Sequence, residues 1–399
     1  MYVNKKGLYR IQDPKFNDVY MSLRLIFDLK YETVTKANLL NYLFSDRLEK
    51  YPTKQAITKA HDLLYGSKFS SYTYSIGKYQ VIELSLIGIN EKFVSEPLHQ
   101  LYVDLLLETL NRPLINEETL REAKKNVSQA IKRQQENPTH YAIFKAFELA
   151  GKGQPFGIST QGYLEEIDDI TLDDIKAFHQ TLLKDAYKEF YVNGDVKTLD
   201  MESMRPLSGT SVIQTDIESK KVFEEQTATQ SEIVQIYPVT IDPTHRLYYA
   251  YLLFIVILGQ SPTSYLFRNI REKESLAYSI YASQLIYDGV FYVMTSVNPS
   301  QEDYVLKRIA DQFTLIRKDS LNLDSAKQYI INKMEGISES PRQSIDFVFR
   351  NNRLNLSDSP QELIEAFKKV TEEEVKDVLG HIGSPYTFVY RGVNNEEIA

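Results

Sequence analysis

Hydrophobic positions along the chain recur with two periods and predict the same order of elements twice. In the first half, the pattern predicts a strand near 19–30, helices over 34–65, two strands over 69–89 and a strand near 187–194. In the second half, it predicts a strand near 230–239, helices near 245–258 and 262–273, and strands near 276–286, 289–297 and 386–391. Further helices precede the closing strand of each half. The repeated order favours two domains of the α+β class.

Two short segments carry the repeat at the level of single residues. Ile-Thr-Leu-Asp-Asp-Ile-Lys at 170–176 matches Val-Thr-Glu-Glu-Glu-Val-Lys at 370–376, and each Thr can cap the helix that follows it. Each helix is followed by a strand that ends on glycine, at Gly194 and Gly392. Such caps and strand-end glycines are common, so chance is the competing explanation. The repeat predicts two topologically similar domains, each an antiparallel-rich sheet backed by helices.

The segment 197–226 separates the two halves. It is polar, loses the periodicity and carries Pro206, Ser208 and Gly209, which is the composition of a linker. The predicted organisation is therefore an N-terminal domain over 1–196, a linker over 197–226 and a C-terminal domain over 227–399.

Composition and charge narrow the class of function. The 399 residues are 43% hydrophobic and 25% charged, which is typical of a globular protein with a real core. A formal net charge of −8 is opposite to what nucleic-acid phosphates attract, so no nucleic-acid partner is expected. The chain has no cysteine, which excludes a disulfide framework and a thiolate metal site.

No membrane partner is expected either. The longest apolar run, 247–258, is shorter than the roughly 20 residues that a spanning helix needs, and we interpret it as a buried core helix. The first 20 residues lack the apolar stretch of a secretory signal, so we expect a cytoplasmic location.

Common catalytic and metal motifs are missing. The chain has six histidines, no two of which stand three or four residues apart as a helical zinc pair requires, so each is expected to be a surface or packing residue. Neither a Gly-x-Ser-x-Gly elbow nor a phosphate-binding Walker loop occurs. The glycines at 151, 153 and 157 are interpreted as a loop between helices.

The segment from Ser264 to Tyr278, Ser-Tyr-Leu-Phe-Arg-Asn-Ile-Arg-Glu-Lys-Glu-Ser-Leu-Ala-Tyr, is the most specific part of the sequence. It resembles the second-half motif of the insulinase/pitrilysin metallopeptidases, the inverted zincins. Pro155-Phe156-Gly157, Gly162 and Asn193-Gly194-Asp195 extend the resemblance into the first half. The resemblance covers roughly residues 15 to 393 and implies the half-clamshell of two related α+β domains that this family builds.

In members of that family that cut peptides, a first-domain helix carries His-x-x-Glu-His, which binds zinc and supplies the general base. The matching positions here are Asn38, Asn41 and Tyr42. Neutral amides and a phenol are poor zinc ligands, and an amide cannot accept a proton at neutral pH. The third, acidic ligand would come from a helix near 115–135 that contains Glu117, Glu118 and Glu122. The chain is therefore expected to bind no catalytic metal and no other cofactor.

The other half of the family's active site is present. Arg271 and Tyr278 match the Arg/Tyr pair of that family, whose guanidinium and phenol can donate hydrogen bonds to the oxyanion of a tetrahedral intermediate. An alternative is that Arg271 belongs to a solvated helix end and that Tyr278 is one of 28 ordinary tyrosines.

Within the family, the chain is most similar to the zinc-motif-lacking subunit of bacterial two-chain members. This implies a heterodimer in which a homologous partner holds the zinc and this chain closes the chamber around a peptide substrate. The alternative is a pseudopeptidase that binds peptides or partners as a scaffold or assembly factor. A self-sufficient hydrolase has little support. The short segment 259–263 replaces the glycine-rich loop of the mitochondrial processing subunit, so presequence recognition is not implied.

Overall fold

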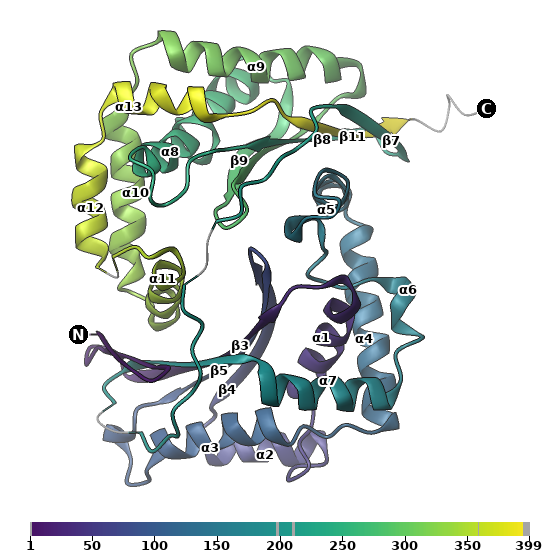
Figure 1. Ribbon diagram of the computed structural model, residues 1–399, viewed down its shortest axis with the longest axis vertical. Coiled ribbons are helices and arrows are strands. Elements are labelled where there is room, and N and C mark those ends of the chain that lie inside the picture. The colour runs from purple at the N-terminus through teal and green to yellow at the C-terminus, as the bar shows by residue number, and fades with distance from the viewer. Residues whose placement is uncertain (1, 197–198, 210–211, 358, 394–399) are drawn as a thin grey trace. The chain divides into compact units, whose positions relative to one another are not determined.

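The computed structural model describes residues 2–196, 199–209, 212–357 and 359–393, and the chain divides into two compact units (Figure 1). Unit 1 consists of Met1–Arg133, Ser159–Thr210 and Ser338–Arg353, and unit 2 consists of Gln134–Ile158, Ser211–Ile337 and Leu354–Ala399. The predicted domains, 1–196 and 227–399, differ from these units in two exchanged segments. Residues 134–158 belong to unit 2, and residues 338–353 belong to unit 1.

The sheet of unit 1 has six strands in the order β1-β2-β6-β3-β5-β4. Its strands are β1 (Tyr2–Lys5), β2 (Leu8–Gln12), β3 (Asp18–Asp28), β4 (Lys68–Ile76), β5 (Tyr79–Ile89) and β6 (Tyr187–Gly194). All pairs are antiparallel except β2 with β6.

The sheet of unit 2 has five strands in the order β7-β11-β8-β10-β9. Its strands are β7 (Lys221–Thr227), β8 (Ser231–Pro238), β9 (Ala277–Leu285), β10 (Val290–Val297) and β11 (Tyr386–Val393). Here too one pair is parallel, β7 with β11, and the others are antiparallel. This order and these directions repeat β2-β6-β3-β5-β4, which confirms the predicted fold of two topologically similar α+β units.

The helices of unit 1 cover both faces of its sheet. They are α1 (Tyr31–Phe44), α2 (Lys54–Leu63), η1 (Glu91–Phe93), α3 (Leu98–Asn111), α4 (Glu117–Gln135), α6 (Leu164–Ile167), α7 (Leu172–Asp185) and α11 (Pro341–Leu354). Alternate residues of β3, such as Leu23 and Leu25, join a core with α1, α3 and α7. The residues between them, Ser22 and Arg24, are equally buried but polar, and Arg24 pairs with Asp346 of α11. The second half of the sequence thus supplies the helix for the polar face.

Unit 2 has the corresponding arrangement. Its helices are α5 (Pro138–Ala150), η2 (Pro155–Gly157), α8 (Tyr248–Ile255), η3 (Val256–Gln260), η4 (Phe267–Lys273), η5 (Pro299–Gln301), α9 (Glu302–Lys318), α10 (Leu323–Ile337), α12 (Pro360–Lys369), α13 (Glu372–Asp377) and η6 (Val378–His381). Ala142 and Ala146 of α5 pack on Val234 of β8 and Phe388 of β11, so the first half of the sequence contributes this helix. The small alanine side chains allow the helix to approach the sheet closely.

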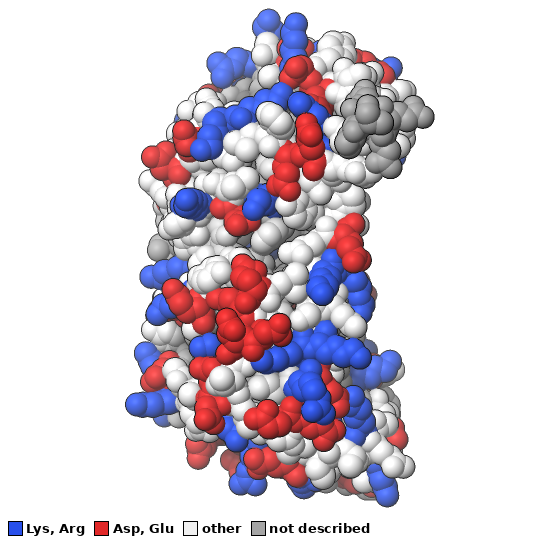
Figure 2. Space-filling model, turned by 90° about the vertical axis from the view of Figure 1, so that its right-hand side faces the viewer, with Lys and Arg blue, Asp and Glu red and all other residues white. Residues whose placement is uncertain are grey.

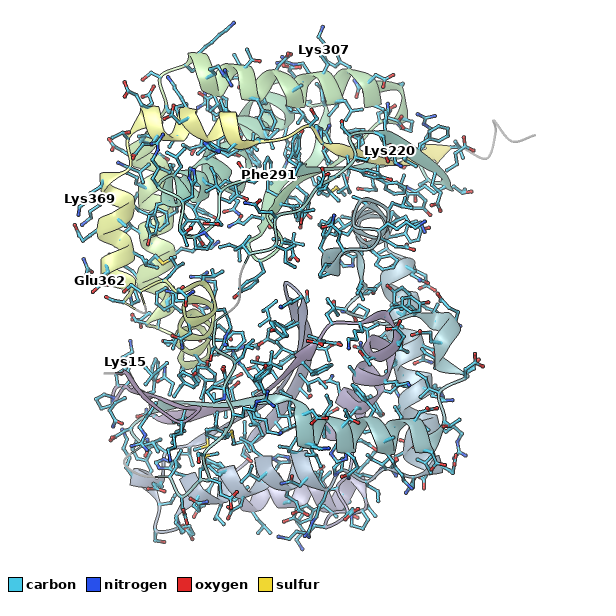
Figure 3. All side chains as sticks on the ribbon, viewed as in Figure 1. Lys15, Lys220, Phe291, Lys307, Glu362 and Lys369 are labelled. Carbon is cyan, nitrogen blue, oxygen red and sulfur yellow. The ribbon has the colours of Figure 1, made fainter. Side chains whose placement is uncertain are left out.

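The interior of unit 2 is aromatic on its other face. Phe291 of β10 is fully buried and stacks on Tyr237 of β8, with ring centroids 4.8 Å apart, and Figure 3 places it inside the unit while Lys307 and Lys369 project outward. The apolar run 247–258 forms α8 and the first half of η3, and nearly all of it is buried as predicted. In the part of the chain that the structure describes, no helix is long and apolar enough to cross a membrane.

The two repeated Thr residues cap helices as predicted. Thr171 and Thr371 each accept a hydrogen bond from the backbone three residues on, and the acids at those positions, Asp174 and Glu374, bond back to the Thr backbone. Such reciprocal capping satisfies two N–H groups that would otherwise lack partners at a helix start.

The predicted linker, 197–226, is more ordered than its composition suggests wherever the structure describes it. Lys188 donates its backbone N–H to the carbonyl of Arg205, and Leu207 donates to Glu189 of β6, so these residues belong to unit 1. Its last residues form β7, whose alternating exposed and half-buried positions are typical of a charged edge strand.

Candidate functional site

The positions of the absent zinc motif lie on one side of α1, facing the edge strand β4. The helix is held by Leu39, Leu40 and Leu43, which are completely buried in the core of unit 1. Asn38 and Tyr42 stand one helical turn apart, so the backbone keeps the spacing that a helical metal pair would use. What has changed is the chemistry of the side chains.

Asn38 is 9% exposed and its amide is fully engaged. Its Nδ2 donates to the carbonyls of Val34, at 2.9 Å, and Thr160, at 2.8 Å, while its Oδ1 accepts from the Thr73 hydroxyl at 2.9 Å. The loop that contains Thr160 is brought close to α1 at Gly162, which requires glycine because its φ is +83° and a Cβ there would lie 2.9 Å from the Cα of Thr35. Asn38 therefore ties α1 to β4 and to this loop, as a structural residue.

Asn41 and Tyr42 are engaged in the same way. The Ser71 hydroxyl of β4 donates to Oδ1 of Asn41, and Nδ2 of Asn126 on α4 donates to the Tyr42 hydroxyl at 3.1 Å. Burial and the nearby carboxylate of Asp46 raise the pKa of Tyr42, so its phenol stays protonated at neutral pH. Together with Asn38 these side chains line a cavity of about 310 Å³ whose polar groups are amides and hydroxyls.

The acidic residues proposed from the sequence as a third ligand are occupied elsewhere. Glu118 and Glu122 of α4 pair with Arg47 at 3.1 and 3.0 Å, and Glu122 also pairs with Lys54 at 2.9 Å. The hydrogen bond from Lys54 lowers the pKa of Glu122. Glu117 is exposed in the first turn of the same helix.

These residues do not fit a zinc ion. Zinc requires deprotonated nitrogen, sulfur or oxygen ligands, whereas two amides and a protonated phenol occupy the motif positions. Among the residues that the structure describes, no group of three or more His, Cys, Asp or Glu side chains is placed to hold a metal.

His179, His245 and His381 lie in packing contacts. Nε2 of His179 lies 2.7 Å from the carbonyl oxygen of Leu110, and burial lowers the pKa of this imidazole. The rings of His245 and His381, which are far apart in sequence, contact each other with centroids 4.7 Å apart. No sequence spacing could have indicated that contact.

Arg271 and Tyr278 lie at the two ends of one short connection in unit 2. Arg271 is in the last turn of η4, where its guanidinium lies 4.7 Å from the centre of the Phe267 ring. Tyr278 is the second residue of β9, the edge strand of the sheet, and its side chain is 69% exposed. Among the described residues, neither the Arg271 guanidinium nor the Tyr278 hydroxyl has a hydrogen-bond partner, so both donors are available to another molecule.

The connection between them is fixed by residues that the sequence did not reveal. Both carboxylate oxygens of Glu274 accept hydrogen bonds from Nε of Arg308 on α9, at 3.0 and 3.1 Å, and Tyr304 donates to the same carboxylate at 3.3 Å. Ser275 adopts a left-handed backbone with φ of 53°, and Leu276 donates its N–H to the carbonyl of Ile270. These contacts of Glu274 and Leu276 orient the chain between the two candidate donors.

Comparison with known proteins agrees with the fold. Residues 169–330, which include both candidate donors, match the family described as peptidase M16 inactive domain. Over this segment the chain is similar to the M16 (pitrilysin) family, in agreement with the predicted family.

Two relatives align with more than nine-tenths of the chain. The probable inactive metalloprotease YmfF of Bacillus subtilis (strain 168) is 24% identical over 392 residues, which cover 92% of this chain and 91% of that protein. An uncharacterized zinc protease of Rickettsia bellii (strain RML369-C) is 22% identical over 425 residues, covering 96% and 94%.

Solved structures show the same fold. A conserved protein from Enterococcus faecalis V583 superposes with a TM-score of 0.88 at 22% identity, covering 99% of both chains. A peptidase M16 inactive domain from Pseudomonas fluorescens superposes with a TM-score of 0.81 at 18% identity, covering 98% of both. The family match over residues 169–330 and the Bacillus relative together indicate an inactive, metalloprotease-like protein.

Proposed function

We propose that this chain is the non-zinc subunit of a heterodimeric metallopeptidase. In this proposal a homologous partner that bears His-x-x-Glu-His holds the zinc ion and the attacking hydroxide. This chain closes the chamber around a peptide and supplies Arg271 and Tyr278. The proposal rests on one contrast: the metal positions are filled with internally bonded amides and a phenol, while two exposed donors have no hydrogen-bond partner among the described residues.

The chemistry of the two donors suits a developing negative charge. Attack on a peptide carbonyl produces a tetrahedral oxyanion, which hydrogen-bond donors fixed in advance stabilise more than they stabilise the substrate. Arg271 is always charged, and Tyr278 donates through its phenolic O–H, so neither needs to transfer a proton in that step. With its side chain 69% exposed, Tyr278 is accessible for contact with a substrate held by a second chain.

Reconstitution with the partner tests the proposal. The His-x-x-Glu-His chain that co-purifies from the native host would be combined with this chain, and peptide turnover would be measured with Arg271→Ala and Tyr278→Phe. Loss of one oxyanion donor should lower the rate on the order of 10²–10³-fold.

Two matched controls keep the result interpretable. Arg317→Ala and Tyr65→Phe change exposed residues of the same types elsewhere on the surface, and both should leave turnover unchanged. Wild-type turnover in Arg271→Ala and Tyr278→Phe alike would refute the proposal.

A second candidate, a peptide-binding pseudopeptidase scaffold, is favoured by the neutral cavity beside β4. β4 ends the order of strands in the sheet of unit 1, and Ser71 and Thr73 of this strand line the cavity. An edge strand can accept an extended peptide as an additional strand. Fluorescence anisotropy of the lone chain with labelled peptides distinguishes the two candidates. Tight peptide binding without a partner, together with no turnover when the partner is added, would favour the scaffold.

A further inference from the structure

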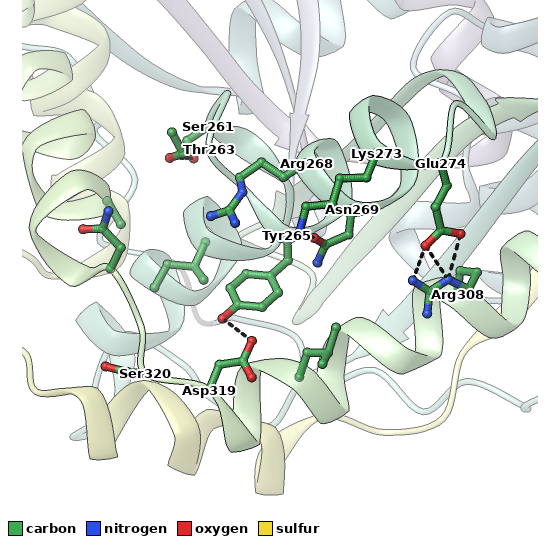
Figure 4. Close-up of a pocket in the computed structure, with 14 residues that line it drawn as sticks. Ser261, Thr263, Tyr265, Arg268, Asn269, Lys273, Glu274, Arg308, Asp319 and Ser320 are labelled. Carbon is green, nitrogen blue, oxygen red and sulfur yellow. Dashed lines mark hydrogen bonds and ion pairs between the residues drawn. The ribbon is translucent and has the colours of Figure 1, made fainter.

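Unit 2 contains a cavity of about 590 Å³ whose lining includes neither Arg271 nor Tyr278 (Figure 4). It lies between η4, the last turns of α9 and the segments around 261–265 and 319–322, all of which belong to this one unit. A volume of this size is typical of sites for small organic molecules and far exceeds that of a single ion.

Two of the three cations that line the cavity, Arg268 and Lys273, have no ion pair among the described residues. The Arg268 guanidinium has no hydrogen bond or ion pair with any described residue, and Nζ of Lys273 bonds only to Oδ1 of Asn269, at 3.2 Å. The acid Glu274, in contrast, is held by Arg308. Arg268 and Lys273 therefore leave two positive charges available to an anionic group.

The remaining acid of the cavity lies at a different point of its wall. Asp319 accepts a hydrogen bond from the Tyr265 hydroxyl at 3.2 Å, and Figure 4 shows the Tyr265 ring between Asp319 and Arg268. A carboxylate repels an anion but accepts hydrogen bonds from hydroxyl groups. A ligand that carries its negative charge near Arg268 and its hydroxyls near Asp319 would suit both the cation and the carboxylate of the wall.

Neutral polar side chains are the largest group in the wall. Its hydroxyl and amide groups come from Ser261, Thr263, Tyr265, Asn269, Ser320 and Asn322. Aliphatic side chains contribute only Ile257, Leu315 and Ala326 to the lining. Such a wall matches a ligand rich in hydroxyls better than an aromatic or lipid-like one.

We propose that this cavity binds a small, hydroxyl-rich organic anion of the sugar phosphate or sugar acid class. Arg268 and Lys273 contact the phosphate or carboxylate, and the polar wall from Tyr265 to Asn322 contacts the hydroxyl groups. The site lies wholly within unit 2, so it requires neither the peptidase partner nor zinc.

Isothermal titration calorimetry of the full chain without a partner tests the site. The probes are glucose 6-phosphate and gluconate, with glucose and inorganic phosphate as the two halves of the expected ligand. We expect at least one of the two anions to bind at least tenfold more tightly than glucose and inorganic phosphate, because only the whole molecule uses both kinds of contact. If glucose 6-phosphate alone binds, Arg268 and Lys273 select phosphate. If gluconate alone binds, they select carboxylate.

Matched variants connect the heat of binding to the cavity. Arg268→Gln and Lys273→Gln should each weaken binding about tenfold or more, because each removes one charge-assisted contact. Arg317→Gln removes an exposed arginine of α9 outside the lining and should bind as the wild type does. Arg268 and Lys273 are both exposed, so both variants should retain the wild-type Tm. No binding of either anion, or wild-type affinity in both lining variants, would overturn the proposal.

Discussion

Glu274 and Arg308 form an ion pair between residues 34 positions apart in sequence, and this pair joins α9 to the turn that separates Arg271 from Tyr278. The hydrogen bonds from Arg308 lower the pKa of Glu274, so the carboxylate stays charged at neutral pH. The ion pair lies beside the two candidate donors and bonds to neither of them. We therefore interpret it as a contact that positions them.

Glu274→Gln should loosen the turn and misplace both donors. A small misplacement of groups near the reacting atoms costs on the order of 10²-fold in rate, so we expect a fall of roughly ten- to 100-fold in the kcat of the reconstituted heterodimer. KM should change little, because the substrate is held by other contacts.

The control for this prediction is Asp311→Asn. It removes the other carboxylate that pairs with Arg308, at 2.9 Å, but leaves Glu274 in place. Its kcat should stay near that of the wild type. If the two variants lose kcat equally, or if Glu274→Gln loses Tm in proportion to its rate, the contact only supports the fold.

Asp288 should make the chain less stable as the pH rises. It lies in the turn between β9 and β10, is 6% exposed, and has an Oδ1 atom with no partner among the described residues. Burial raises its pKa to about 7, from 3.8 for an ordinary Asp. Between these values the unfolded chain releases the proton and the folded chain keeps it, so the free energy of unfolding should fall by about 1.4 kcal/mol per pH unit.

Asp288→Asn tests this directly. The variant should lose that slope between pH 4 and 7 and should be the more stable protein at pH 7.5, as measured by urea denaturation across the range. Asp242→Asn is the control. Hydrogen bonds from Thr244 lower the pKa of Asp242, so this substitution should change the pH slope of the free energy of unfolding in the opposite direction. A wild-type pH slope in Asp288→Asn would contradict the prediction.

Arg353→Ala should destabilise unit 1 strongly. The guanidinium of Arg353 on α11 and the carboxylate of Glu189 on β6 are both fully buried and paired. Removal of the arginine leaves Glu189 charged and buried, with only the Tyr191 hydroxyl and the backbone N–H of Leu207 as donors. A cost of roughly 3–5 kcal/mol in the free energy of unfolding is expected.

Lys15→Ala provides the exposed comparison in the same unit. The pair of Lys15 with Glu339 spans 3.2 Å, but both side chains are solvated, so its removal should cost less than about 1 kcal/mol. Urea denaturation measures both variants. Similar losses in the two would mean that burial of the Arg353 pair does not determine its contribution.

The interior of unit 1 explains which part of the fold could be predicted from sequence. The hydrophobic period predicted the strand near 19–30 that forms β3, and the Thr171 and Thr371 caps supported the repeat. In β3, Leu23 and Leu25 alternate with Ser22 and Arg24, and such alternation normally means that the polar face is solvated. No local pattern reports that α11, more than 300 residues away, buries Arg24, because that contact is a property of the tertiary fold.

The strands missed by the sequence share one physical property. β1, β2 and β7 lie at or near the edge of their sheets, where side chains are half exposed and the hydrophobic period is weak. The candidate donors could be found because they stand in one continuous motif. The ion pair of Glu274 with Arg308 could not be found from the sequence, because Arg308 lies on a separate helix.

Restoring the motif residues alone should not restore a zinc site. The triple variant Asn38→His, Asn41→Glu and Tyr42→His returns two histidines to one side of α1, but zinc needs a third protein ligand. Glu122 cannot move to that position without leaving Arg47 and Lys54. Native mass spectrometry of the triple variant at micromolar zinc should therefore show no stoichiometric metal.

A fourth substitution should change that result. Asn126 is the α4 residue whose side chain meets Tyr42, at 3.1 Å, and it lines the same cavity as Asn38 and Asn41. Asn126→Glu, added to the triple variant, places a carboxylate opposite the two histidines, and one zinc ion per chain should then bind. Adding Lys125→Glu instead, an exposed neighbour outside the lining, is the control and should bind none. Stoichiometric zinc in the triple variant would mean that the ion pairs of Glu122 do not prevent metal binding. The loss of the site would then reside in the residues at 38, 41 and 42 alone.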